Sequence, residues 1–216
     1  MLAELRADAC YYHKLYFPRR SASALTWLRL LLSAHGLWIL AVTRLSAYYI
    51  AKRKHDKSFS FWLMLLGTFS TFISFFISIL FCKSDILAST SLAGGIYLSD
   101  YGHIIMGAHS VGSGTIIHNR VTIGKNLIGE GTPEIGRNVW IGPYCVIYGD
   151  VKIGDGVTVL PYTVLTKSIP AGAVVQGNPA RIIARNIDNS FLRQSLCTNI
   201  EVSNLIKPVN KGLKLV

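Results

Sequence analysis

Residues 135–183 read IGRNVWIGPYCVIYGDVKIGDGVTVLPYTVLTKSIPAGAVVQGNPARII, and in this stretch an aliphatic side chain returns every six residues. Extended toward the N-terminus, the register runs through Ile105, Val111, Ile117, Ile123, Gly129, Ile135, Ile141, Ile147, Ile153, Val159 and Leu165. A period of six fits neither a helix nor a simple strand, so it predicts a unit that turns a corner once per repeat. Gly, Pro, Asn or Asp usually follows the aliphatic residue, where the chain must bend. Three sides close one coil, and stacked coils bury a continuous aliphatic column. The pattern predicts a β-solenoid.

These hexads resemble the hexapeptide-repeat acyltransferases, a family of left-handed parallel β-helices. The family includes serine acetyltransferases, galactoside and maltose acetyltransferases, and polysaccharide O-acetyltransferases. The resemblance covers residues 84–186 and supplies the handedness, because crossovers between parallel strands are otherwise almost always right-handed. It implies a mostly β fold, a left-handed parallel β-helix preceded by an apolar α-helical domain, assembled as a homotrimer. We therefore expect a helical domain at 1–83, the β-helix at 84–186 and a C-terminal tail at 187–216.

Two parts of the solenoid depart from the regular pattern. In the first coils Leu87, Ala93 and Ser99 occupy the inward positions, a poor register that first coils often show because they also accept a cap. The run GKNLIGEGTPE, residues 124–134, places Gly129 at an inward position. We expect it to project as a loop from one corner, and such loops on a scaffold often carry function.

Composition indicates an apolar chain with a basic N-terminal part. Hydrophobic residues make up 50% of the chain and charged residues 15%, with a net charge of +11. Residues 1–57 hold ten Lys and Arg against three acids, whereas residues 83–186 hold eight against six. The sequence has no recognised nucleic-acid motif, so we expect no nucleic-acid partner. Basic residues beside an apolar run instead indicate an anionic membrane surface.

The N-terminal part offers two topologies. Residues 1–23 predict a short helix and are too polar for a signal peptide. Residues 24–51 are apolar but contain Arg29, His35 and Arg44, which favours a packed helix. Residues 59–82 carry no charge and are long enough to span a membrane. A single span with the basic run KRKHDK (52–57) cytoplasmic would place the solenoid outside, away from acetyl-CoA. Two alternatives remain open. The helices form a bundle packed on neighbouring subunits, or they associate with the inner face of the cytoplasmic membrane.

The four cysteines predict no metal site. Cys10, Cys82, Cys145 and Cys197 are scattered without the spacing of metal ligands. We expect reduced thiols in a cytoplasmic protein and no metal cofactor. Cys145 lies within a hexad and is interpreted as a small buried residue rather than a nucleophile.

The resemblance assigns a binding site for acetyl-CoA, the acyl donor. Pro143 and Pro161 are 18 residues apart, one full coil, so they stack at the same corner. They match positions that line the pantetheine tunnel of galactoside and maltose acetyltransferases. Further matches in that branch are a Thr-Lys pair, a C-terminal Arg and a Trp beside the acceptor pocket: Thr166, Lys167, Arg181 and Trp140. Cationic side chains suit the phosphates of coenzyme A. The alternative is that the TKSIP and NPAR segments merely close the last coils.

The general base is harder to assign. Acyl transfer to a hydroxyl needs a group that removes its proton, and histidine is suited to this. Serine acetyltransferases carry an Asp-His pair in their first coils, which falls on Ser99 and Asp100 here, and a loop His that falls on Thr132. We therefore expect His103 and His118, on the same side as Trp140, to be the catalytic candidates, with Asp100 orienting His103. The alternative is that both are solvated wall residues.

These observations predict an acetyl-CoA-dependent O-acetyltransferase that acts on a sugar hydroxyl in surface-polysaccharide biosynthesis. Its acceptor would be a glycan or a lipid-linked glycan at the inner face of the cytoplasmic membrane. Two alternatives are a serine O-acetyltransferase and a non-catalytic β-helix scaffold. Asp100 and Thr132, at the two expected His positions, weigh against serine.

Overall fold

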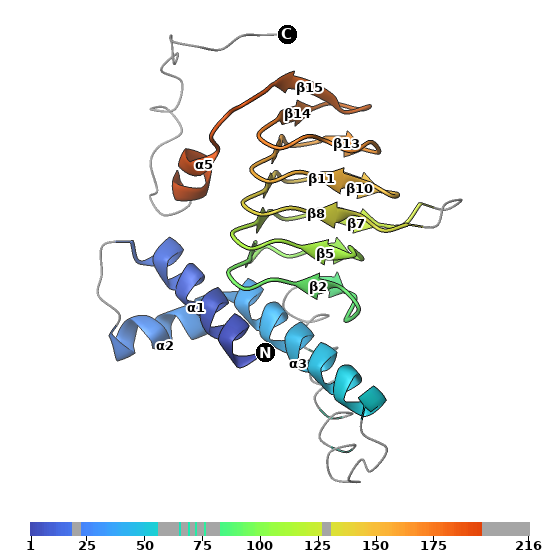
Figure 1. Cartoon of the computed structure of the whole chain (residues 1–216). Helices are drawn as coiled ribbons and strands as arrows, with labels where there is room; N and C mark the ends of the chain where they lie inside the picture. Colours follow the sequence, from blue (N-terminus) through green and yellow to red (C-terminus); the bar gives the residue numbers. More distant parts are fainter. Residues whose placement is uncertain are drawn as a thin grey trace.

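A computed structural model describes residues 1–18, 23–55, 83–126 and 131–195, together with Leu65, Phe69, Phe72 and Phe76. Three helices, α1 (Leu2–Tyr16), α2 (Ala24–Ser33) and α3 (His35–His55), lie at one end of a stack of short strands. The stack rises from them, and a short helix, α5 (Ser190–Ser195), lies beside its middle coils (Figure 1).

The strands form three sheets, one on each side of the stack. The first contains β1 (Asp85–Ile86), β4 (Ile105–Met106), β7 (Thr122–Gly124), β10 (Val146–Tyr148) and β13 (Val164–Leu165). The second contains β2 (Ser91–Leu92), β5 (Ser110–Val111), β8 (Glu134–Ile135) and β11 (Lys152–Ile153). The third contains β3 (Tyr97–Leu98), β6 (Ile116–Ile117), β9 (Trp140–Ile141), β12 (Thr158–Val159), β14 (Val174–Gln176) and β15 (Arg181–Ala184). Neighbouring strands are parallel except β15, which returns antiparallel to β14.

The aliphatic register confirms the predicted solenoid. Ile117 pairs with Ile141, which in turn pairs with Val159, and all three side chains are fully buried. On the next side Ile123, Ile147 and Leu165 are likewise in register and at most 1% exposed. Each such buried aliphatic side chain contributes about 1.5–3 kcal/mol relative to exposure. The column therefore holds the coils together from inside.

The predicted register is wrong in the first coils. Ile105 and Leu87 were expected to point inward, but their side chains are 52% and 51% exposed. The buried residue of β4 is Met106, and the corner from there to Val111 is one residue shorter than a hexad. Leu92 and Leu98 take the positions expected for Ala93 and Ser99, although Ser99 is also buried. The corner between Leu98 and Met106 is longer than a hexad, so the buried residues before it lie one position earlier than predicted, and a shift of one residue changes the face.

A longer coil marks the expected loop. Ile135 pairs with Val111, 24 residues earlier, whereas Ile153 pairs with Ile135 after only 18. The additional residues lie between β7 and β8. Residues 127–130, including Gly129, lie outside the described residues.

The stretch 24–51 forms two helices rather than the one expected. α2 begins with a capping box in which the Ser23 side chain accepts from the Thr26 backbone N–H. It ends at Ser33, and α3 leaves at 82°. The backbone N–H of Gly36 in the first turn of α3 donates to the Asp100 carboxylate at 2.8 Å. A side chain at Gly36 would collide with the Leu98 carbonyl and the Tyr12 hydroxyl, so only glycine allows this approach.

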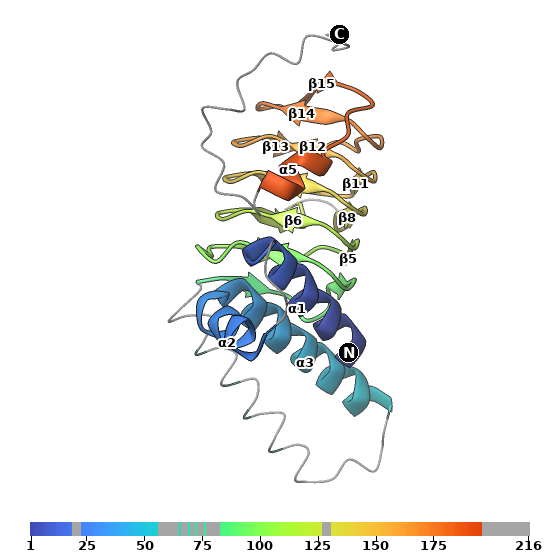
Figure 2. The ribbon, with the colours of Figure 1, turned by 90° about the vertical axis from the view of Figure 1, so that its left-hand side faces the viewer.

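Helices α1 and α3 are attached to the first coils by buried polar contacts. The Arg44 guanidinium binds the Asp8 carboxylate at 2.8 Å and also donates to the Leu92 carbonyl at 2.8 Å. The Tyr12 hydroxyl accepts from the Leu98 N–H at 2.9 Å and donates to the Leu98 carbonyl at 2.7 Å. Figure 2 shows α1 alongside the lower coils and α3 crossing beneath them. The helices therefore cover the open end of the solenoid.

No single helix in the described part of the chain has the length and apolar composition of a membrane span. The bent pair formed by Ala24–Ser33 and His35–Lys52 passes that test only when the two helices are taken together. The interpretation of residues 59–82 falls outside the described residues except at four positions. Leu65, Phe69, Phe72 and Phe76 are helical, and their side chains are exposed.

Candidate functional site

The structure brings Thr166, Lys167 and Arg181 together, as the sequence predicts. All three line one pocket of about 220 Å³ whose wall also contains Ile169, Pro179 and Ala180. Lys167 follows β13, whereas Arg181 begins β15, so two separate strands deliver the two cations. Both side chains are exposed. Two cations at one small pocket can bind a phosphate group through charge-assisted hydrogen bonds.

Pro143 and Pro161 lie at the same corner on successive coils, between β9 and β10 and between β12 and β13. The carbonyl of Pro143 accepts from the N–H of Tyr162 at 3.1 Å, which places the two corners directly over one another. The predicted stacking of the prolines is therefore present.

Sequence analysis missed the aromatic residues next to these prolines. The rings of Tyr144 and Tyr162 stack with centroids 4.8 Å apart and an interplanar angle of 11°. The Arg120 guanidinium lies 5.4 Å from the centre of the Tyr144 ring. All three residues have positive φ, between 56° and 62°, where glycine is normally preferred. The sequence signal that could have revealed these residues is a large side chain at a corner position, where glycine would fit more easily.

His118 and Trp140 meet on the outer wall of the third sheet. Their ring centroids are 4.8 Å apart. The backbone N–H of His118 donates to the Ile141 carbonyl at 3.0 Å, so β9 fixes its height on the wall. Its Nε2 atom is buried and has no hydrogen-bond partner among the residues that the structure describes. Burial lowers the pKa of His118 to about 4, so the imidazole is neutral at physiological pH. A neutral ring can accept a proton.

Asp100 and His103 are placed differently from His118. The Asp100 carboxylate accepts from Gly36 at the start of α3, and within the described residues no hydrogen bond joins it to His103. Burial raises the pKa of Asp100 to about 6. His103 is exposed at the corner between β3 and β4, with φ of 58°. The expected orientation of His103 by Asp100 is thus not what the geometry favours, because Asp100 caps a helix.

The structure describes the surroundings of Cys145 and of the side chains that could bind a metal ion. Cys145 is fully buried, and burial raises the pKa of its thiol to about 11, so it is not an activated nucleophile. Throughout the described ranges, no group of three His, Cys, Asp or Glu side chains is arranged to hold a metal ion.

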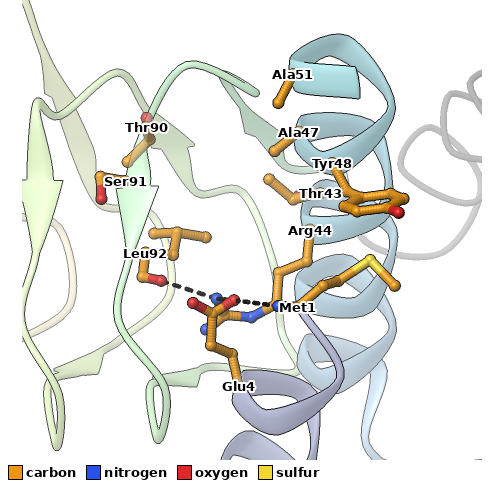
Figure 3. Close-up of a pocket in the computed structure, with 10 residues that line it drawn as sticks. All are labelled: Met1, Glu4, Thr43, Arg44, Ala47, Tyr48, Ala51, Thr90, Ser91 and Leu92. Atoms are coloured by element: carbon orange, nitrogen blue, oxygen red, sulfur yellow. Dashed lines mark hydrogen bonds and ion pairs between the residues drawn. The ribbon is translucent and has the colours of Figure 1, made fainter. Parts of the chain in front are cut away.

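A second pocket, of about 270 Å³, lies between the helices and the first coil (Figure 3). Thr43 and Arg44 of α3 face Thr90 and Ser91 across it, with Glu4 of α1 at one side. Glu4 binds Arg44 at 3.2 Å, so the charges that line the pocket compensate one another. The contacts of Arg44 join the helices to the solenoid, and we assign this pocket a structural rather than a catalytic role.

Comparison with known families identifies the repeat. A model of the family described as bacterial transferase hexapeptide (six repeats) matches residues 132–167. This segment is similar to the bacterial transferase hexapeptide repeat. The matched hexapeptides include Trp140, both corner prolines and Lys167. No curated protein sequence matches the chain.

Solved structures similar to this chain include serine acetyltransferases. The enzyme from Brucella abortus strain S19 in complex with coenzyme A has a TM-score of 0.68 at 22% identity, covering 87% of this chain and 69% of that one. The enzyme from Vibrio cholerae O1 biovar El Tor N16961 has a TM-score of 0.67 at 24% identity, covering 90% and 69%. That of Neisseria gonorrhoeae in complex with serine has a TM-score of 0.65 at 23% identity, covering 84% and 70%. This likeness confirms the fold as a left-handed parallel β-helix with an N-terminal helical region.

Proposed function

We propose that the protein is an acetyl-CoA-dependent O-acetyltransferase. The observation that carries the proposal is the pocket in which Thr166, Lys167 and Arg181 meet, because these residues match a coenzyme A site by sequence and come together in space. The hexapeptide repeat and the likeness to a serine acetyltransferase that holds coenzyme A add support. Lys167 and Arg181 would bind phosphates, and Pro143 and Pro161 would line the path of the pantetheine arm.

His118 is the residue we propose as general base. The acceptor hydroxyl oxygen attacks the thioester carbonyl carbon while its proton passes to Nε2 of His118. The carbon–sulfur bond then breaks, and the proton leaves on the sulfur of coenzyme A. Nε2 suits this role because no group in the described ranges hydrogen-bonds to it and because it belongs to a neutral ring. Contact with Trp140 holds the ring in place. The low pKa makes His118 a weak base, which is compensated where an oxyanion forms nearby.

L-Serine is the acceptor that the comparisons favour. The similar solved structures are serine acetyltransferases, one of them in complex with serine, and the likeness extends over the helical region as well as the solenoid. This support moves serine ahead of the sugar hydroxyl that sequence analysis placed first.

A sugar hydroxyl of a surface polysaccharide or its lipid-linked precursor remains a second candidate acceptor. The specific observation in its favour is that Asp100 stands where a serine acetyltransferase has a histidine and here caps α3. A site without that histidine has lost one of the groups expected to act on serine. We also propose that the chain works at the inner face of the cytoplasmic membrane, close to such a precursor.

The test is thiol release from acetyl-CoA by the purified protein, with L-serine compared against oligosaccharide and lipid-linked sugar acceptors. Lys167→Ala and Arg181→Ala should each raise KM for acetyl-CoA about tenfold, as expected for loss of one charge-assisted contact. Lys152→Ala, which removes a lysine exposed on the second sheet, is the matched control and should leave KM unchanged.

Release only with serine would establish a serine O-acetyltransferase, and release only with a sugar would establish the second candidate. A folded protein that neither binds coenzyme A nor releases thiol with any acceptor would overturn the proposal and favour the non-catalytic scaffold.

A further inference from the structure

Helix α2 exposes an apolar face that packs against nothing in the described structure. Thr26 and Leu30 are its buried residues. Four leucines lie outward with 52–68% of their surface exposed: Leu25, Leu28, Leu31 and Leu32. Their spacing places them along one side of the helix. Isolated exposed leucines are ordinary, but four on a single short helix form a patch that requires a partner. We call these four residues the leucine face.

Other exposed apolar residues follow along the chain. Toward the end of α3, Leu45, Tyr48 and Ile50 are 41–49% exposed. Beyond it, Leu65, Phe69, Phe72 and Phe76 recur at the spacing of one helix face and are 47–65% exposed. All of residues 59–82 lack charge. The leucine face thus belongs to an N-terminal region that presents apolar side chains repeatedly.

The charges of this region decide which partner fits. Residues 1–57 hold ten Lys and Arg but only three acids. Two of those acids, Glu4 and Asp8, bind the buried Arg44, so they do not neutralise the basic residues at the surface. Arg29 is exposed within the leucine face itself. At the bend the indole of Trp38 donates to the Leu31 carbonyl at 2.6 Å, which sets an aromatic ring at the edge of the face.

We infer that the leucine face of α2 docks on an anionic lipid bilayer, with the helix lying in the plane of the interface. Apolar side chains would enter the acyl boundary while Arg29 meets anionic headgroups. A second copy of this chain would bring an equally basic surface against the first, which opposes association. An anionic lipid surface would instead attract the basic residues. This docking is independent of the catalytic proposal, since it requires no acetyl transfer.

The experiment is vesicle flotation with the purified full-length chain after detergent removal. Vesicles of phosphatidylcholine alone are compared with vesicles that also contain phosphatidylglycerol. The variant Leu28→Gln/Leu31→Gln should lower the partition coefficient at least tenfold, because each leucine loses its transfer into the acyl boundary. The matched control Leu2→Gln/Leu87→Gln changes two leucines that are 68% and 51% exposed elsewhere, and it should bind as the parent does.

A second variant tests the electrostatic half of the inference. Arg29→Gln should lower binding to vesicles with phosphatidylglycerol about fivefold and leave binding to neutral vesicles unchanged. Circular dichroism and sedimentation verify that each variant folds and keeps its oligomeric state.

Two results would overturn the inference. One is unchanged flotation of Leu28→Gln/Leu31→Gln, which would mean that other residues bind lipid. The other is a folded parent that does not float with anionic vesicles, together with a leucine variant that dissociates into smaller oligomers. That result would assign the leucine face to a second copy of the chain.

Discussion

Asp100 illustrates how one carboxylate position can serve a fold rather than a reaction. Its folded pKa of about 6 lies above the ordinary value of 3.8, so this group contributes stability at acid pH that is lost as the pH rises from about 4 to 6. We expect Asp100→Asn to retain the hydrogen bond to Gly36, to abolish this slope and to keep acetyl transfer within about twofold. Thermal unfolding followed across pH, with activity assays, measures both.

Asp100→Ala is the matching control for the cap. It removes the acceptor for the N-terminus of α3 and should lower stability by about 1 kcal/mol. A large loss of activity in Asp100→Asn with unchanged unfolding would show instead that the carboxylate takes part in catalysis.

His118 has the opposite pH signature. Its folded pKa of about 4 lies below the ordinary 6.5, so the unfolded chain binds the proton more tightly and stability falls as the pH drops from about 6.5 toward 4. We predict that NMR shows no titration of this ring between about pH 5 and 8. We also predict that His118→Gln lowers kcat by about 10²–10⁴ with little change in coenzyme A affinity.

His109→Gln changes an exposed histidine next to the second sheet and is the control for His118. It should leave kcat as in the parent. If kcat for His118→Gln stays within a factor of a few, the base is another residue.

Tyr162 tests the cost of the left-handed corner. At φ of 62° a β-branched side chain is far less tolerated than asparagine, while both substitutions remove the stacking with Tyr144. Tyr162→Val should therefore be less stable than Tyr162→Asn by about 1–2 kcal/mol. Denaturant titration compares the two, and equal stabilities would mean that the corner relaxes to a different backbone conformation.

Among the elements, the attachment of α1 and α3 to the solenoid depends on a buried ion pair. Asp8 is fully buried and Arg44 is 5% exposed, and Asp8 also accepts from the backbone N–H groups of Gly95 and Ile96. Burial raises the pKa of Asp8 even though Arg44 opposes that shift. Asp8→Ala leaves the guanidinium buried without its carboxylate and should lower stability by about 3–5 kcal/mol.

The exposed pair Lys152–Glu134 provides the comparison for that prediction. Glu134→Ala removes an ion pair of 3.3 Å between exposed side chains and should change stability by less than about 1 kcal/mol. The double variant Asp8→Ala/Arg44→Met should recover part of the loss in urea titrations. If the double variant recovers no stability, the loss in Asp8→Ala comes from its backbone hydrogen bonds to Gly95 and Ile96.

The elements also show where sequence reasoning succeeds. From Val111 to Ile123 and from Ile135 to Leu165 an aliphatic residue returns every six residues and is buried in the same environment, so local pattern and structure agree. The bend between α2 and α3, in contrast, is accompanied by a contact with a distant residue. Asp100 lies 64 residues from Gly36 and caps α3, and no local sequence pattern near residue 36 predicts this contact.

In the candidate site, too, the features set by the repeat could be predicted from the sequence, and those set by the helical domain could not. Stacking of Pro143 and Pro161 follows from the length of a coil, and the meeting of Lys167 with Arg181 follows from a family motif. The pairing of His118 with Trp140 needs only the neighbouring register, and it was expected. The roles of His103 and Asp100 stay predictions; the structure adds that Asp100 accepts a hydrogen bond from the helical domain, whose position the repeat does not encode.

At the scale of the whole molecule, we expect a homotrimer. The resemblance to hexapeptide-repeat acyltransferases implies it. Sedimentation equilibrium of the detergent-solubilised chain, corrected for bound detergent, should give three times the mass of 23.8 kDa. A monomer at micromolar concentration would contradict this expectation.

The hydroxyl of Tyr12 has a consequence beyond joining α1 to the solenoid. A stack of parallel coils has no inherent length, since its last strand offers the same row of backbone groups that recruited the one before, and another molecule could continue the ladder. At β3 these backbone groups already have a partner, because the Tyr12 hydroxyl accepts from the Leu98 N–H and donates to the Leu98 carbonyl. At the far end β15 runs in the opposite direction to the coils. In the third sheet, addition of another coil is thus opposed at one end by a side chain, and at the other end the parallel ladder stops at an antiparallel strand.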